Sequence, residues 1–213
     1  MHKTLRIATT AALLVVPGVF AQKGEIGVVA GGGFYTKGSV TSPAGTGDVG
    51  FKSGAAVGAI FGHNQYRYLG GELRYEWLPG DQKVSSSGTE ATFSSESHAI
   101  HYDFLVHFRP VESNIRPFVA AGAGVKVYRG TGKETATQPL SRLALLTHTL
   151  ETKGLGVWGA GIKAKIAPAV LLRVEFRDFI TPFPRQIIAP SIGAKISGIL
   201  HHFVPMAGLT FTF

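Results

Sequence analysis

The sequence has 213 residues and contains no cysteine, so disulfide bonds are excluded as a source of stability. After the first 21 residues it also lacks any apolar run of about 20 residues that is free of glycine and charge, the length that a membrane-spanning helix needs. Insertion into a membrane through helices is therefore not expected.

The first 21 residues are typical of a secretory signal peptide. Lys3 and Arg6 supply the positive start, residues 11–16 form an apolar centre, and Ala21 is a small residue before the expected cleavage site. The apolar centre is too short to span a bilayer, and a buried N-terminal helix is the alternative. Residues 22–213 are expected to form one domain, which could be periplasmic, secreted or an outer-membrane barrel.

The charge and glycine content narrow the class of protein. The formal net charge is +8, and removal of Lys3 and Arg6 leaves 8 − 2 = +6. A basic exported protein favours anionic partners such as lipopolysaccharide phosphates. Nucleic-acid binding is not expected, because the chain is exported and lacks a basic helix. The 28 glycines suit crowded strands and tight turns better than helices.

Alternation of apolar residues with small or polar residues is the main pattern. At the C-terminus it places Leu209, Phe211 and Phe213 on one face of a strand and glycine or threonine on the other. About eight segments near ten residues long show this period of two, which is typical of an outer-membrane barrel. These segments are residues 25–35, 53–62, 68–78, 98–109, 117–129, 155–167, 169–179 and 203–213.

The connections between these segments alternate in length. Residues 63–67, residues 110–116 and Pro168 form short connections, and the other connections are long. The long connections are residues 36–52, 79–97, 130–154 and 180–202. The predicted fold is all-β: an eight-stranded antiparallel up-and-down transmembrane β-barrel with short periplasmic turns and long extracellular loops.

The faces opposite the apolar ones carry charges, which the barrel would turn into its lumen. The predicted lumen charge network consists of Glu72, Arg74, Glu76, Asp103, Lys163, Lys165, Arg173, Glu175 and Arg177. Eight strands leave room for side chains and little else, so these charges must be paired. We expect a salt-bridged plug, and a charged ion path is the alternative.

Two other interpretations of polar residues are weaker. His101, Asp103 and His107 share one face and could bind a metal, but no second cluster completes a tetrahedral site. A lipid hydrolase needs a serine nucleophile with a base and an acid, and the candidates show no recognisable spacing. The residues concerned are Ser191, Ser197, His201 and His202. We expect no catalytic residue, metal or cofactor, and the protein is predicted not to be an enzyme.

Two of the long connections contain apolar residues. Residues 140–146 could form a short amphipathic helix on the outer leaflet, or a strand extension or cap over the barrel mouth. Residues 180–202 are unusually apolar for an exposed loop and contain three prolines. They could fold into the mouth, extend the last hairpin, or contact a partner or lipid.

Together these residues resemble the small outer-membrane β-barrel superfamily, which contains the OmpA-like transmembrane domain. The resemblance rests on the signal peptide, on residues 116–124 and 172–179, and on the terminal Phe213. It implies a monomeric eight-stranded barrel with a closed lumen. It also implies that Leu209, Phe211 and Phe213 form a C-terminal signal for the barrel assembly machinery. A peptidoglycan-binding domain, present in two-domain members, is not expected.

The sequence therefore predicts an integral protein of the bacterial outer membrane with a structural or surface-interaction role. Members of the superfamily serve as structural elements, adhesins, surface-resistance factors or narrow channels. One alternative is a small channel or carrier for small or apolar solutes. Another is a soluble periplasmic lipocalin-like binder, in which the inner and outer faces exchange roles. The expected partners are outer-membrane lipids, lipopolysaccharide and the barrel assembly machinery.

Overall fold

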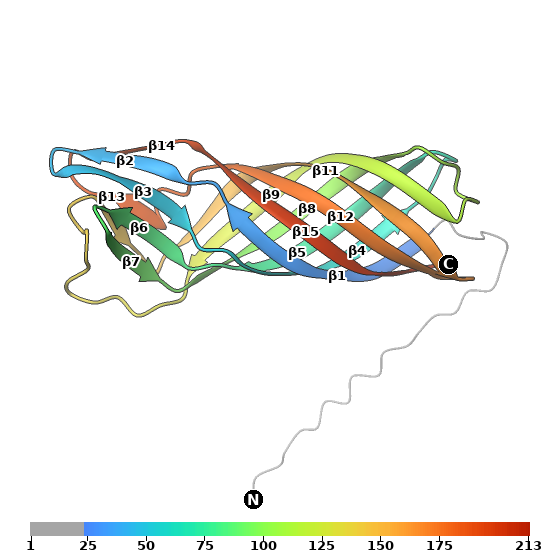
Figure 1. Cartoon of the computed structure of the whole chain (residues 1–213), viewed down its shortest axis with the longest axis horizontal. Coiled ribbons are helices and arrows are strands. Elements are labelled where there is room, and N and C mark those ends of the chain that lie inside the picture. The colour runs from blue at the N-terminus through green and yellow to red at the C-terminus, as the bar shows by residue number, and fades with distance from the viewer. Residues whose placement is uncertain (1–23) are drawn as a thin grey trace, which may run out of the picture.

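The computed structural model describes residues 24–213, and the predicted signal peptide lies outside them. Eight antiparallel strands close into a barrel in the order β1-β15-β12-β11-β9-β8-β5-β4 (Figure 1). The barrel strands are β1 (Gly24–Tyr35), β4 (Gly54–His63), β5 (Leu69–Pro79), β8 (Ser95–His107), β9 (Ile115–Gly130), β11 (Leu150–Ala167), β12 (Val170–Pro182) and β15 (Ile199–Thr212). The predicted all-β barrel and its strand number are confirmed.

The barrel closes between the first and last described strands. Ile26 of β1 pairs with Phe211 of β15, and β1 also pairs with β4. Gly24 and Phe213 exchange backbone hydrogen bonds of 3.0 Å, so both lie at the end that carries the short turns. In outer-membrane barrels this is the periplasmic end. No helix within residues 24–213 is long and apolar enough to cross a membrane.

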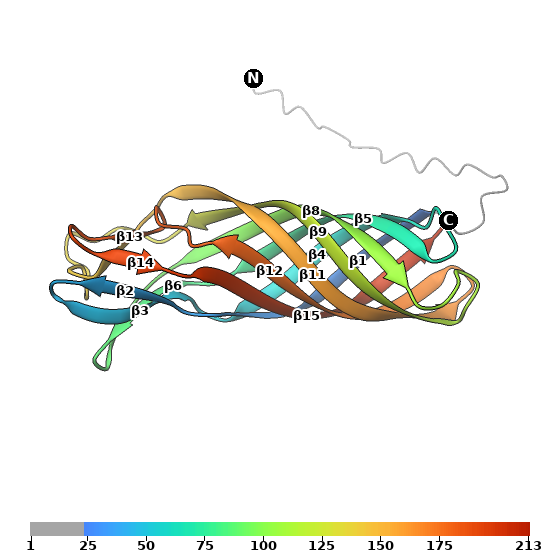
Figure 2. The same ribbon diagram turned by 90° about the horizontal axis from the view of Figure 1, so that it is seen from above.

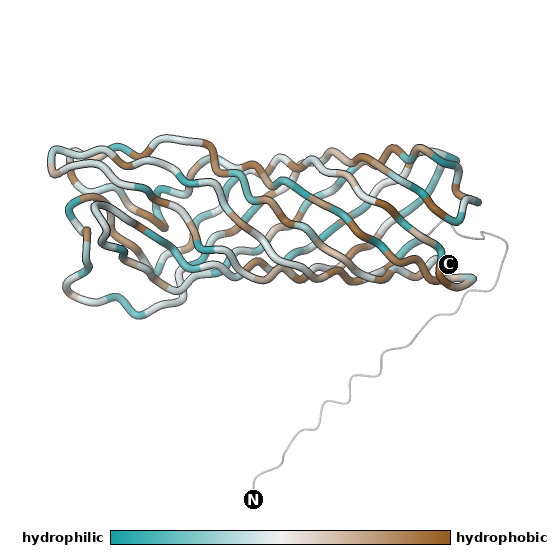
Figure 3. The backbone as a smooth tube through the Cα atoms, in the orientation of Figure 1, coloured by the Kyte–Doolittle hydropathy of each residue, from teal (hydrophilic) through white to brown (hydrophobic). Residues whose placement is uncertain are grey.

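Burial follows the predicted alternation and orients the faces. Along β4, buried residues alternate with exposed ones from Ala55 to His63. The exposed positions of the barrel include Val28, Phe104 and Phe211, whereas the charged positions lie inside. Figure 3 shows the same alternation of hydrophobic and hydrophilic residues along the strands. The lipocalin-like arrangement is therefore wrong, because it requires the charged face to point outward.

The long connections, which were predicted as extracellular loops, fold into two small sheets that we call the extracellular cap. Its strands are β2 (Gly38–Ser42), β3 (Gly45–Phe51), β6 (Gln82–Ser86), β7 (Thr89–Phe93), β10 (Ala144–Leu146), β13 (Ile188–Pro190) and β14 (Lys195–Ser197). The five-stranded sheet has the order β14-β2-β3-β6-β7, and β10 pairs with β13. Figure 2 shows the hairpin of β6 and β7 projecting to one side of the cap.

The cap encloses its own hydrophobic core. It draws on β2, β3, β6, β7, β10, β13 and β14 and on the upper ends of the barrel strands β9 and β15. The buried members are Val40, Val49, Phe51, Val84, Ala91, Phe93, Tyr128, Leu143, Ala144, Leu146, Phe183, Ile187, Ile188, Ile196 and Leu200. Residues that would be loops in a minimal barrel thus bury apolar side chains against one another, which drives their folding.

The structure of the cap shows which conformation the two apolar connections, residues 140–146 and 180–202, adopt. Residues 140–146 form a turn followed by β10, and Leu143 and Leu146 are buried in the cap core. The amphipathic helix is therefore wrong. The first and last residues of the connection 180–202 lengthen β12 and β15, which pair as a hairpin. The residues between them place Phe183 and Ile187 in the same core.

A second apolar cluster lies within the barrel. It includes Val29, Ile60, Leu155, Phe179 and Met206. These side chains come from β1, β4, β11, β12 and β15 and face the lumen. The barrel interior therefore combines an apolar cluster with a charged region, and the latter holds the predicted lumen network.

Candidate functional site

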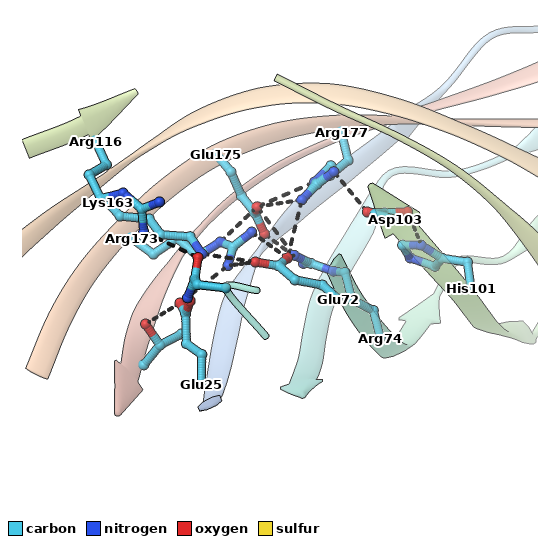
Figure 4. A network of polar contacts seen from close by, with 12 residues as sticks. Glu25, Glu72, Arg74, His101, Asp103, Arg116, Lys163, Arg173, Glu175 and Arg177 are labelled. Atoms are coloured by element: carbon cyan, nitrogen blue, oxygen red, sulfur yellow. Dashed lines mark hydrogen bonds and ion pairs between the residues drawn. The ribbon is translucent and has the colours of Figure 1, made fainter. Parts of the chain in front are cut away.

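The charged region of the lumen is built mainly from two strands. Alternate residues of a strand share one face, so β5 contributes Glu72, Arg74 and Glu76, while β12 contributes Arg173, Glu175 and Arg177. The two strands are not neighbours in the barrel, and their side chains meet across the lumen (Figure 4). Six charges of alternating sign therefore face one another.

Glu72 and Glu175 are the centres of this network. Glu72 accepts two hydrogen bonds of 2.6 Å from the guanidinium of Arg173 and a third of 3.0 Å from Lys163 Nζ. Glu175 accepts 2.6 and 3.2 Å bonds from Arg74 and a 2.9 Å bond from Arg173 Nε. The carboxylates of Glu72 and Glu175 are 2% and 0% exposed. Each buried carboxylate is thus compensated by several cations, as burial of a charge requires.

One branch of the network runs through His101. Its Nε2 lies 2.9 Å from Glu76 Oε2, and its Nδ1 lies 2.7 Å from Asp103 Oδ1. A neutral imidazole has one N–H donor, so two carboxylate contacts require the protonated ring. Asp103 then pairs at 2.8 Å with Arg177, and Glu76 at 2.8 Å with Arg74. His101 therefore acts as a cation that links β8 to β5.

The other branch leads to Glu25 near the short-turn end. Glu25 accepts 2.7 and 2.8 Å bonds from Lys163 Nζ and Thr210 Oγ1. Asn64 Nδ2 donates to the same carboxylate at 3.4 Å. Glu25 lies on β1, Lys163 on β11 and Thr210 on β15, so this branch ties the closing seam of the barrel to a strand that is not adjacent to it.

Phe118 packs against the charged side chains, and a glycine of the barrel wall leaves space for one of them. The Phe118 ring lies 4.9 Å from Arg173 Cζ and 5.7 Å from Arg177 Cζ, so it contacts two guanidinium groups through cation–π interactions. Gly122 faces Asp103, and a Cβ there would collide with the Asp103 carboxylate. The absence of a side chain at Gly122 therefore leaves space for the Asp103 carboxylate.

The structure brings together every predicted network residue except Lys165. Lys165 is exposed at the short-turn end, next to a register shift between Lys165 and Ala167. This part of the prediction is wrong, because β11 reaches the mouth of the barrel before Lys165 can meet a carboxylate. The prediction also missed Glu25, although Glu25 has the same parity as the inward Gly27 and Val29.

A second buried cation lies near the cap. Lys126 Nζ is 3.0 Å from His202 Nδ1 and 3.4 Å from Tyr35 Oη, and it lies 4.8 and 5.1 Å from the ring centroids of Tyr35 and Tyr128. Lys126 is fully buried. An aromatic cage of this kind stabilises an ammonium group that has no carboxylate beside it.

Of the residues considered for metal binding, His101 and Asp103 are in contact, but His107 does not join them. Both ring nitrogens of His101 are engaged, whereas the His107 ring packs 5.8 Å from Phe118. Within residues 24–213 there is no group of three or more His, Cys, Asp or Glu residues that could hold a metal ion.

The hydrolase candidates also have separate partners. Ser191 donates to the backbone of Ser141, and Ser197 bonds to Ser39 at 3.1 Å. The neighbouring histidines bond elsewhere, one to Asp178 and the other to Lys126. No serine–histidine pair is formed by these four residues.

The predicted C-terminal signal residues lie on the outer face of β15. Leu209, Phe211 and Phe213 are 39%, 52% and 63% exposed in the isolated chain. Their neighbour Thr210 points inward to Glu25. This strand therefore presents an apolar row to the surroundings of the barrel and polar contacts to its interior.

These features define an outer-membrane β-barrel, and comparison with known proteins agrees. Residues 9–185 match the family described as outer membrane protein beta-barrel domain, and the chain belongs to this family. The protein is accordingly an OmpA-like barrel of the bacterial outer membrane. A search of curated proteins found no match.

Solved structures share the fold at low sequence identity. The outer membrane protein OprG from Pseudomonas aeruginosa is 12% identical with a TM-score of 0.60, over 91% of this chain and 97% of OprG. Neisserial surface protein A is 12% identical with a TM-score of 0.52, over 88% of this chain and 97% of its own. The outer membrane protein AlkL is 11% identical with a TM-score of 0.51, over 100% and 97%. At this identity the likeness concerns the fold alone.

Proposed function

We propose that this protein is a non-catalytic outer-membrane barrel with a closed lumen, whose cap presents an interaction surface outside the cell. The observation that carries the proposal is the network around Glu72 and Glu175, in which charges from opposite walls are bonded to one another and excluded from solvent. An ion path needs hydrated charges that a permeating ion can reach. Paired, buried side chains occupy that space instead.

Single-channel recording in planar bilayers tests the closed lumen. Protein purified from outer membranes is expected to give no steady conductance at neutral pH. Steady, protein-dependent conductance of the unaltered protein would contradict the proposal and favour a small channel.

We further propose that the upper barrel contacts lipopolysaccharide. A surface hollow of about 450 Å³ is lined by both basic and apolar residues. Lys153 and Arg185 supply the positive charge, and Ile180, Phe183 and Ile199 supply the apolar part. Ile199 is 63% exposed. An amphiphile with phosphates on an apolar anchor has the chemistry that complements this surface.

Co-purification of lipopolysaccharide tests this contact. The Lys153→Ala and Arg185→Ala double variant should retain several-fold less lipopolysaccharide after detergent extraction than the unaltered protein. Lys133→Ala, which removes a cation outside the hollow, is the control and should retain the normal amount. Equal retention by all three proteins would exclude the hollow as the contact.

The outer face of β15 carries the residues that we propose as a signal for assembly of the barrel. We propose that the barrel is a monomer and that the barrel assembly machinery recognises Leu209, Phe211 and Phe213. Replacement of Phe213 by Ala should lower the amount of folded protein in the outer membrane, measured by heat-modified gel mobility of the membrane fraction. An unchanged amount would contradict this role.

A further inference from the structure

A small cleft opens at the short-turn end of the lumen, and it is lined by cations and hydroxyl groups. Its lining includes Arg116, Lys163, Lys165, Ser113 and Thr212. The cavity volume is about 20 Å³, enough for one water-sized group. A ligand can therefore insert only one or two small atoms there, with the rest of it facing the periplasm.

Arg116 is the most informative residue of the cleft. It is 3% exposed, and its Nη1 donates to Asn64 Oδ1 at 3.2 Å. Its Nε and Nη2 atoms are buried and have no hydrogen-bond partner among residues 24–213. Buried N–H groups that have no acceptor are costly. The structure therefore presents two unused donors in a cleft that has an opening.

Charge counting shows that no carboxylate of the network is left for Arg116. The five carboxylates are Glu25, Glu72, Glu76, Asp103 and Glu175, and the cations that contact them are Lys163, Arg74, Arg173, Arg177 and protonated His101. These charges balance without Arg116. Residues 1–23 contain no Asp or Glu, so the part of the chain that is not described cannot supply one. Figure 4 shows Arg116 at one end of the network and His101 at the other.

Lys165 adds a second unpaired charge to the same cleft. It is exposed and has no ion pair within residues 24–213. An oxyanion is the ligand that matches these groups, because a guanidinium donates two parallel bonds to paired oxygens and an ammonium adds a point charge. Neutral or cationic ligands would leave both charges uncompensated.

We propose that this periplasmic cleft is an oxyanion site that binds a phosphate or carboxylate group through Arg116 and Lys165. The ligand enters from the periplasm, and its oxygens accept the free N–H groups of Arg116. Lys165 neutralises the remaining charge at the rim, while the Ser113 and Thr212 hydroxyl groups complete the lining. The bound anion closes the charge balance of the lumen at the end opposite the cap.

Calorimetric titration of the full-length processed protein tests the proposal. The protein is extracted from outer membranes into a maltoside detergent, which carries no phosphate, and is titrated with inorganic phosphate or with acetate at constant ionic strength. Saturable binding of at least one anion is expected. Tighter binding of phosphate identifies a phosphate site, and tighter binding of acetate identifies a site for a carboxylate.

Three variants distinguish anion binding in the cleft from non-specific attraction of anions to a basic protein. Arg116→Gln should weaken binding about tenfold or more, since a hydrogen bond to a charged group is lost. Lys165→Gln should weaken it about threefold, because an exposed charge is screened. Arg109→Gln removes an exposed cation of the same rim that does not line the cleft, and its affinity should not change.

Heat-modified gel mobility first establishes that each variant is folded. If Arg116→Gln does not fold, exposed Lys165 still decides the question through the comparison of Lys165→Gln with Arg109→Gln. The proposal is overturned if folded, unaltered protein binds neither anion saturably. It is equally overturned if Lys165→Gln loses no more affinity than Arg109→Gln and Arg116→Gln either binds as tightly as the unaltered protein or does not fold.

Discussion

The lumen network and the cap core are both buried, yet their chemistry is opposite. The network is made of ion pairs such as Arg173–Glu72, whereas the cap core is made of side chains such as Val40, Phe183 and Ile187. The barrel wall faces lipid, so its apolar residues lie outside and its charges inside. The cap strands face water, so their apolar residues lie inside and their polar residues outside, as in a water-soluble protein. The solvent outside each region, more than burial itself, determines which side chains lie within.

The two regions should also fail differently. A buried charge depends on every partner, because removing one leaves the others uncompensated in a low dielectric. An apolar contact is lost in proportion to the volume removed. We therefore expect that one substitution in the network destabilises the whole network. A substitution in the cap core should destabilise only the cap.

The largest effect is expected from Glu72→Gln. The amide keeps the shape of the side chain but removes the charge that compensates Arg173, Lys163 and Arg74, at a cost of about 3–5 kcal/mol. Urea unfolding in detergent micelles, followed by tryptophan fluorescence, measures the change. Glu112→Gln is the control, because Glu112 is 66% exposed in its pair with Arg67. If both variants unfold at the same urea concentration, the network does not act as a unit.

The next effect concerns the cap. Ile187 is fully buried in the cap core, and Ile187→Ala should destabilise the cap by about 2–4 kcal/mol. Limited proteolysis should cleave this variant within the cap, while heat-modified mobility shows an intact barrel. Ile192→Ala is the matched control, because Ile192 is completely exposed. Loss of the barrel in Ile187→Ala would show that the two regions are not independent.

A smaller effect is expected where the barrel wall contacts the network. Gly122→Ala places a methyl group against the Asp103 carboxylate and the Tyr102 backbone, which should cost about 1–3 kcal/mol through overpacking. Gly154→Ala, in β11, meets no atom within 4 Å and should be neutral or slightly stabilising. The urea midpoints of the two variants compare the positions directly. Equal midpoints would mean that the wall tolerates the added volume.

The smallest effect concerns an ion pair on the outside of the cap. Hydrogen bonds from Lys83 and then Lys52 lower the pKa of Glu90 from its ordinary value. A lowered carboxyl pKa contributes stability above the unfolded pKa and loses it as the pH falls through the folded pKa. Because these groups are exposed, Glu90→Gln should change the unfolding midpoint little at neutral pH. A large shift at pH 7 would show that surface charge, and not the apolar core, holds the cap together.

Much of the barrel was predictable because its signal is local. Period two alone placed the eight barrel strands and assigned Glu72, Arg74, Arg173 and Glu175 to the same side. Such parity needs no knowledge of neighbours, since every second side chain of a strand shares a face. The terminal row of Leu209, Phe211 and Phe213 follows from the same rule.

The remainder depends on where strands begin, end and meet. The alternation along the strand predicted that Lys165 points into the lumen. The register shift near Ala167 and the end of the barrel leave Lys165 at the mouth instead. Glu25 is a single charge at the start of a strand and reveals its role only through Lys163 and Thr210. The seven cap strands are three to seven residues long, too short for alternation to stand out, and their core joins distant segments.

The longest strands determine how far the cap stands from the membrane. β11 has 18 residues, and at about 3.3 Å per residue with a tilt near 45° it rises about 40 Å. The apolar band of an outer-membrane barrel is about 25 Å tall, and the turns at the other end are short. Most of the excess therefore lies on the cap side. The upper barrel thus separates the cap from the apolar band of the membrane, so the cap strands fold in water and not in lipid.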